Sequence, residues 1–217
     1  MWNNNSSLPM SLIETILVLP QEIPLLNEHL QRVQDSVQQL SWPDNSSYYD
    51  KIAQDLLAIA NKTQTPTVYR MEWAFSGYQY YHKFTSRALP SPKEIESWTL
   101  APYQIFYSLY ARTRNLKLAF RERYNKAMQQ KTDSKDLLLL NQYGKITESS
   151  IANLFFRINE QWFTPCLSTG CVNGVFRRHF IKEERVQPII ISIDQVNMID
   201  EMYLGNAVRG LWKVTLL

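Results

Sequence analysis

Hydrophobic positions in the first ninety residues follow two different periods. Some apolar runs have the length of a strand, whereas others recur at three- and four-residue intervals, as in a helix that packs on one face. The expected order is a strand, two helices and two strands, at residues 12–19, 24–40, 48–61, 68–75 and 78–84. This order predicts a small unit of mixed helices and strands.

The helix expected at 24–40 has two distinct faces. The apolar residues from Leu26 to Leu40 form the stripe that should pack on a core. His29, Arg32 and Ser36 share another stripe of the same helix, turned away from the main apolar face. Arg32 is therefore expected off the main core face, where an ordinary surface arginine is the simplest interpretation.

The second half of the chain follows a stretch with two prolines, residues 88–98, which is the best candidate for a domain boundary. We expect a small N-terminal domain at 11–90 and a larger β-rich domain at 100–217. Helices are expected at 116–130 and 175–182, and strands at 137–140, 145–147, 152–158, 161–164, 189–193, 202–204 and 211–216.

Composition and charge narrow the classes of protein. The 217 residues are 45% hydrophobic, which suits a globular core, and 23 basic residues nearly balance 20 acidic ones without forming a dense basic block. We therefore expect no nucleic-acid partner. The apolar run 12–19 is too short to span a bilayer and is interrupted by Glu14, so a cytoplasmic protein without membrane contact is expected.

The two cysteines, Cys166 and Cys171, form neither a disulfide framework nor a four-ligand metal set. They could bind a metal together with His179, but their spacing is not that of a zinc site. Small core or loop residues are the better interpretation, and we expect no metal.

Several sequence blocks lie in an order that points to one family. The strings GKITESSIANLFF, WFTPCLSTGCVNGVFRRHFI and EMYLGNAVRGLWKV follow one another, and SLIETI with LLNEHLQRVQDSVQQL precedes them. They resemble the motifs of class IV aminotransferases and 4-amino-4-deoxychorismate lyases, which are fold-type IV enzymes dependent on pyridoxal phosphate (PLP). The resemblance covers nearly the whole chain. It implies a two-domain α+β fold like that of D-amino acid aminotransferase.

PLP needs an anion site for its phosphate and a carboxylate that keeps its ring nitrogen protonated. By the resemblance, Glu148 supplies the carboxylate, although a lone glutamate beside a turn is more often solvated. Arg32 matches the phosphate-binding arginine of the family, and the backbone N–H groups at a helix start can bind phosphate without any special side chain. The cofactor contacts implied by the motifs are thus Arg32, Glu148, Asn153, Val175, Phe176 and Asn206. Asn206 is about equally well explained as a turn asparagine.

PLP also needs an amine, and Lys117 with Arg121 and Tyr124 fits a K-x-x-x-R pattern followed by an aromatic residue. Strict family spacing before Glu148 would instead reach Asn115, so Lys117 requires a shorter loop. An ordinary solvated helix lysine is the alternative for Lys117, and Lys126 is the second choice. Burial beside cations would lower the pKa of the catalytic amine.

The resemblance favours a 4-amino-4-deoxychorismate lyase that forms p-aminobenzoate and pyruvate in folate synthesis. A class IV aminotransferase for branched-chain or D-amino acids would use the same groups, and a non-catalytic PLP-binding member is a third hypothesis. Leu17 stands where many aminotransferases have an arginine, so Arg70 and Arg87 are candidate partners for the carboxylate of a small amino substrate. The resemblance also implies a homodimer.

Overall fold

The N-terminal half of the protein is a three-stranded antiparallel sheet with two helices. The computed structural model describes residues 10–91, 98–105, 113 and 115–217. The elements of this half are β1 (Ser11–Val18), α1 (Leu26–Leu40), α2 (Ser46–Lys62), β2 (Thr67–Ser76) and β3 (Gln79–Ala88), with strand order β1-β2-β3. The predicted order of elements is confirmed, and α1 begins two residues later than expected.

The two faces of this sheet have different surroundings. One face packs on α1 and α2 through a core that includes Ile16, Met71 and Trp73 from the strands and Val33 and Ile52 from the helices. Because side chains alternate along a strand, the opposite face carries the residues between them. On that second face, the register places Thr15 of β1 directly across from Arg70 of β2.

The C-terminal half contains eight strands in one sheet, with short helices around it. Its elements are β4 (Trp98–Gln104), α3 (Glu122–Gln129), β5 (Asp136–Leu140), β6 (Ile146–Glu148), β7 (Asn153–Ile158), β8 (Gln161–Pro165), the 3-10 helix η3 (Leu167–Thr169), α4 (Val175–Glu184), β9 (Gln187–Ile189), the 3-10 helix η4 (Ile193–Met198), β10 (Glu201–Asn206) and β11 (Gly210–Leu216). The strand order is β10-β11-β4-β5-β6-β7-β8-β9, and β10 pairs with β7 as well. Strands β10, β11, β4, β5, β6 and β7 therefore close into a ring.

Three sequence predictions in this half were wrong. Strand β4 was not expected because it follows the proline-rich stretch and itself contains Pro102. The strand expected at 189–193 ends at Ile189, and Ser192 caps the 3-10 helix that follows. The helix expected at 116–130 spans only 122–129. Its first part is extended instead, because backbone hydrogen bonds join Lys117 and Ala119 to the edge of β1.

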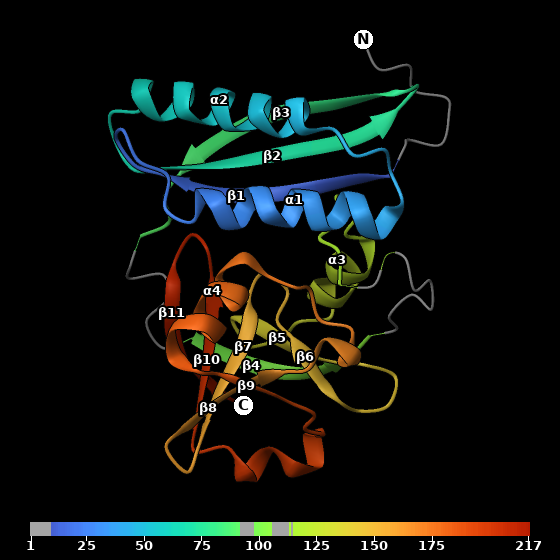
Figure 1. Cartoon of the computed structure of the whole chain (residues 1–217). Coiled ribbons are helices and arrows are strands. Elements are labelled where there is room, and N and C mark those ends of the chain that lie inside the picture. The colour runs from blue at the N-terminus through green and yellow to red at the C-terminus, as the bar shows by residue number, and fades with distance from the viewer. Residues whose placement is uncertain (1–9, 92–97, 106–112, 114) are drawn as a thin grey trace.

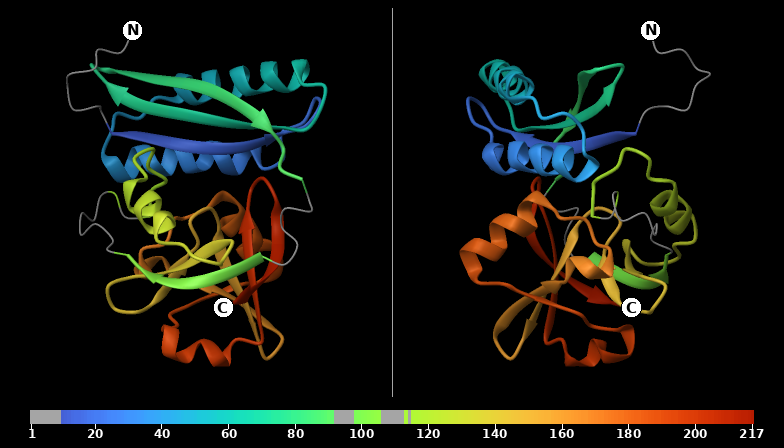
Figure 2. Two further views of the ribbon diagram at one scale, coloured as in Figure 1. Left: turned by 180° about the vertical axis from the view of Figure 1, so that it is seen from behind. Right: turned by 45° about the vertical axis from the view of Figure 1, so that its right-hand side comes forward.

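The two halves lie one above the other, with α1 and β1 facing the second half (Figure 1). Helices α3 and α4 lie on the side of the eight-stranded sheet that faces α1, and the views in Figure 2 agree. Part of the predicted domain boundary, residues 92–97, lies outside the described residues, so the division into domains stays a prediction. Within the described residues, none of the helices is long and apolar enough to cross a membrane.

Candidate active site

A cavity of about 220 Å³ is lined by residues from both halves of the protein. Its wall includes every residue that the sequence nominated as a cofactor or substrate contact, namely Arg32, Arg70, Arg87, Lys117, Glu148, Asn153, Val175, Phe176 and Asn206. These positions come from two helices, several strands and one extended segment that lie far apart in the sequence. Folding therefore gathers the nominated residues around a single space.

Lys117 reaches this cavity from the extended segment that precedes α3. The backbone N–H of Ile13 donates to the carbonyl of Lys117, and the lysine Nζ donates to Thr15 Oγ1 at 3.1 Å. Burial, together with the nearby positive charge of Arg32, lowers the pKa of this amine to about 7. The amine can therefore be unprotonated near neutral pH. Lys126, by contrast, pairs with Glu122 on the exposed surface.

Glu148 ends β6 and is buried, with only 3% of its surface exposed. The Tyr124 hydroxyl donates to its Oε1 at 2.6 Å, and the backbone N–H of Val172 donates to its Oε2 at 2.9 Å. Burial raises the pKa of Glu148. The carboxyl group is therefore an oriented and desolvated side chain, and the interpretation as a solvated glutamate is wrong.

Arg32 belongs to a buried cluster of charges rather than to the surface. Its Nε donates to Glu14 Oε1 at 2.7 Å, its Nη2 also donates to Glu14, and His29 Nδ1 lies 2.6 Å from Glu14 Oε2. Burial alone would raise the pKa of Glu14, but Arg32 and His29 together lower it to about 2. The stripe of α1 that turns away from the apolar core is thus buried as well, against Glu14 and the cavity.

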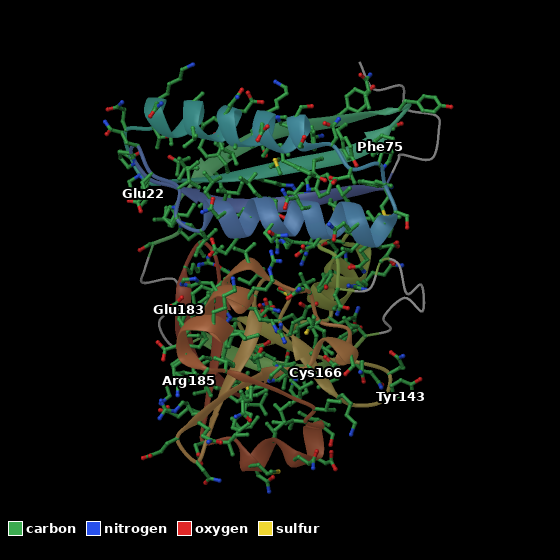
Figure 3. The ribbon with its side chains drawn as sticks, viewed as in Figure 1. Glu22, Phe75, Tyr143, Cys166, Glu183 and Arg185 are labelled. Atoms are coloured by element: carbon green, nitrogen blue, oxygen red, sulfur yellow. The ribbon has the colours of Figure 1, made fainter. Side chains whose placement is uncertain are left out.

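The start of α4 forms a second anion-binding feature of the cavity wall. Glu183 and Arg185, at the other end of α4, lie at the outer edge of the molecule (Figure 3), whereas Val175 at its start is buried and lines the cavity. Among the residues that the structure describes, no side chain caps its N-terminus. The helix dipole and the N–H groups of Val175 and Phe176 therefore favour an anion at this end.

Two glycines allow the chain segments at this end of the cavity to approach one another. A Cβ on Gly174 would lie 2.0 Å from Oδ1 of Asn153, and a Cβ on Gly205 would lie 2.6 Å from the ring of Phe176. The amide of Asn153 donates to the carbonyl of Val172 at 2.8 Å, which holds the loop before α4. Asn153 therefore shapes the helix start through its contacts within the protein.

Asn206 lines the cavity but also stabilises its own turn. Its Oδ1 accepts hydrogen bonds from the backbone N–H groups of Val208 and Arg209, at 3.0 and 2.9 Å. This geometry supports the alternative of a turn asparagine. A direct contact from the Asn206 side chain to a ligand stays a prediction.

Arg70 and Arg87 lie on the face of the N-terminal sheet that borders the cavity. Arg70 pairs loosely with Glu72 at 3.8 Å, and Arg87 is exposed. Leu17 stands across from Val68, which in turn stands across from Arg87. Arg87 thus occupies the same row of the sheet as Leu17, two strands away.

Four groups that support the site were not nominated as site residues from the sequence: Glu14, His29, Thr15 and Asn115. Glu14 had a detectable signal, because it is a charged residue inside an apolar strand and needs a buried partner.

Asn115, the residue at strict family spacing, does not line the cavity. Its Nδ2 donates to the carbonyls of Leu167 and Cys171 at 2.8 and 2.5 Å, and its own carbonyl accepts from the backbone N–H of Asn173.

We expect Asn115→Ala to lower the free energy of unfolding by about 2–3 kcal/mol, because it removes two half-buried hydrogen bonds and leaves alanine in a left-handed conformation. The φ angle of Asn115 is +68°. Asn115→Gly is the matched control, since glycine tolerates this φ and loses only the hydrogen bonds. Urea titration measures both variants. Equal losses for the two variants would contradict the assigned contribution of the backbone conformation.

The residues around the cavity fit the cofactor that the sequence resemblance implies. The buried carboxylate of Glu148 suits the ring nitrogen of PLP, and the amine of Lys117, with its low pKa, suits the aldehyde. The guanidinium of Arg32 and the uncapped start of α4 suit the phosphate. His29 also lines the cavity, and its buried Nε2 has no hydrogen-bond partner among the described residues. Burial lowers the pKa of His29, which favours the neutral ring.

Comparisons with known proteins agree with this fit. A Schizosaccharomyces pombe protein provisionally named an aminodeoxychorismate lyase is 26% identical over 222 aligned positions, covering 95% of this chain and 90% of the relative. The crystal structure of 4-amino-4-deoxychorismate lyase from Pseudomonas aeruginosa superposes with a TM-score of 0.81 at 19% identity and covers 99% of this chain and 88% of that one. A Mesorhizobium loti structure provisionally named an amino-acid aminotransferase superposes with a TM-score of 0.83 at 23% identity. It covers 96% of this chain and 100% of that one.

These two structures establish the shared fold, and the predicted α+β class is confirmed. The family model for class IV amino-transferases matches residues 11–217. The chain therefore belongs to the class IV aminotransferase family, whose members are PLP-dependent enzymes.

Proposed function

We propose that this protein is a 4-amino-4-deoxychorismate lyase, which releases pyruvate from its substrate and leaves p-aminobenzoate. The observation that supports this reaction best is the charge of the cavity wall. Five arginines and one lysine line the cavity, whereas Glu148 is its only carboxylate among the described residues. The substrate carries two carboxylates, and a cation-rich wall suits two negatively charged groups.

The cations come from different elements of the cavity wall, Arg32 from α1 and Arg70 and Arg87 from β2 and β3. Arg32 and the start of α4 would hold the phosphate of PLP. The ring of the bound cofactor would supply the electron sink. Arg70 and Arg87 remain on the sheet face for the carboxylates of the substrate. Thr15, which accepts the hydrogen bond from Lys117, stands directly across from Arg70. An anionic substrate held by Arg70 would therefore lie beside the amine.

Lys117 is the group that we propose to move the proton. With a pKa of about 7, its amine can accept a proton and return it at neutral pH. Thr15 holds the Nζ in place, and Arg32 and Arg121 disfavour the charged form of the amine. Glu148 would serve as the acceptor that keeps the ring nitrogen of the cofactor protonated.

The rate at which the apoprotein takes up PLP should rise with pH and level off above about pH 7. The reason is that only the unprotonated amine of Lys117 is a nucleophile, and its pKa lies near 7. Stopped-flow measurement of the yellow absorbance checks this expectation. A midpoint near pH 10, the ordinary value for a lysine, would contradict the proposed environment of the amine.

Product analysis tests the reaction itself. Purified protein loaded with PLP should convert aminodeoxychorismate to equal amounts of p-aminobenzoate and pyruvate. Formation of glutamate from 2-oxoglutarate and an amino donor, without these products, would replace the lyase by an aminotransferase. The Mesorhizobium loti structure supports this second function as the alternative, because that protein is provisionally named an aminotransferase and has the same fold.

Two further expectations belong to this proposal. The resemblance implies a homodimer, which light scattering of the loaded protein would detect as twice the mass of one chain. A role in folate synthesis implies a cytoplasmic enzyme, which fractionation of cells expressing the protein would test.

A further inference from the structure

Both oxygens of the Glu148 carboxylate already have a donor within the protein. One donor is the hydroxyl of Tyr124 and the other is the backbone N–H of Val172. Tyr124 and Glu148 are both buried, with exposed fractions of 5% and 3%. A hydrogen bond between two desolvated groups depends little on solvent, so the hydroxyl has a direct influence on the carboxylate.

Tyr124 is in turn connected to positive charge. The Nη2 of Arg123 donates to the Tyr124 hydroxyl oxygen at 3.0 Å. The guanidinium carbons of Arg121 and Arg123 lie 4.1 and 4.8 Å from the centroid of the tyrosine ring. A hydroxyl that accepts from a cation is polarised and donates more strongly in the other direction. Arg123, Tyr124 and Glu148 thus form a directed chain of hydrogen bonds.

We propose that Tyr124 and Arg123 are positioning residues that orient the Glu148 carboxylate towards the cavity and oppose its protonation there. The inference rests on the role proposed above for Glu148. Neither residue needs to touch the cofactor, because both act through the carboxylate. Burial alone would favour the protonated carboxyl group, which could no longer stabilise a positive ring nitrogen.

A double-mutant cycle on PLP binding tests the inference. Tyr124→Phe removes one hydroxyl and should raise the dissociation constant for PLP by about tenfold or more, because a hydrogen bond to a charged group is lost. In the Glu148→Gln background the same change should have almost no effect, since the ionised acceptor is gone. Quenching of tryptophan fluorescence gives the dissociation constants, and the absorption spectrum of each loaded variant gives a second readout. Tyr143→Phe, at a residue 74% exposed, is the matched control and should change neither quantity.

The outcomes separate the possible roles. An equal rise in the dissociation constant in both backgrounds would show a merely structural tyrosine and overturn the inference, as would no rise in the native background. If Glu148→Gln alone changes neither binding nor the spectrum, the role of Glu148 itself is wrong. Should Tyr124→Phe fail to fold, Arg123→Gln replaces it, with a smaller expected rise of about threefold that must also vanish in the Glu148→Gln background.

Discussion

Replacing Lys117 by alanine is expected to lower kcat by about 10⁴-fold or more, because the variant loses both the nucleophile and the proton carrier of the site. The loaded protein should also lose its yellow absorbance. Among the described residues, Lys117 is the one lysine in the wall of the cavity, and its amine has a pKa of about 7. Steady-state kinetics and absorption spectra measure the two effects.

Lys126→Ala is the matched control for this experiment. Lys126 lies on the exposed side of α3 and pairs with Glu122, four residues earlier in the helix. Its loss should leave both kcat and the spectrum unchanged. A yellow, active Lys117→Ala variant would contradict the assignment, and a colourless Lys126→Ala variant would transfer the role to Lys126.

Replacing Arg32 by alanine should destabilise the fold by about 3–5 kcal/mol, because it leaves the buried charge of Glu14 without its guanidinium partner. Glu14 is 2% exposed, and Arg32 binds it through both Nε and Nη2. The phosphate site should weaken at the same time. Thermal and urea unfolding of the apoprotein measure the stability separately from cofactor binding.

The double variant Arg32→Ala with Glu14→Gln separates these two effects. Neutralising Glu14 should restore much of the stability without restoring affinity for PLP. The pH dependence has a definite sign as well. The pKa of Glu14 is lowered in the folded state to about 2 from 4.5, so its stabilising contribution is present above pH 4.5 and is lost as the pH falls towards 2. A double variant as unstable as Arg32→Ala would contradict the charge-burial explanation.

Local periodicity predicted most of the fold because most elements here bury one regular face. The failures occurred where tertiary contacts override the local pattern. The segment from Leu116 to Arg121 has helix-forming residues, but the open edge of β1 offers its backbone partners that the sequence cannot reveal. Pro102 concealed β4, although this strand pairs in parallel with a strand on either side.

The site could be nominated from motifs because its chemistry demands particular residue types. Glu148 and Arg32 were named in this way, and both line the cavity. The groups that hold them were harder to find. Tyr124 meets Glu148 across 24 residues and Glu14 meets Arg32 across 18, and such pairings follow from the fold rather than from spacing.

The most direct test of the account is to locate the covalent bond between the protein and PLP. Borohydride reduction of the loaded protein should fix the cofactor on one lysine, and mass spectrometry of the digested chain should find it on the peptide containing Lys117. A modified Lys126 peptide, or a chain that carries no cofactor after reduction, would contradict the account.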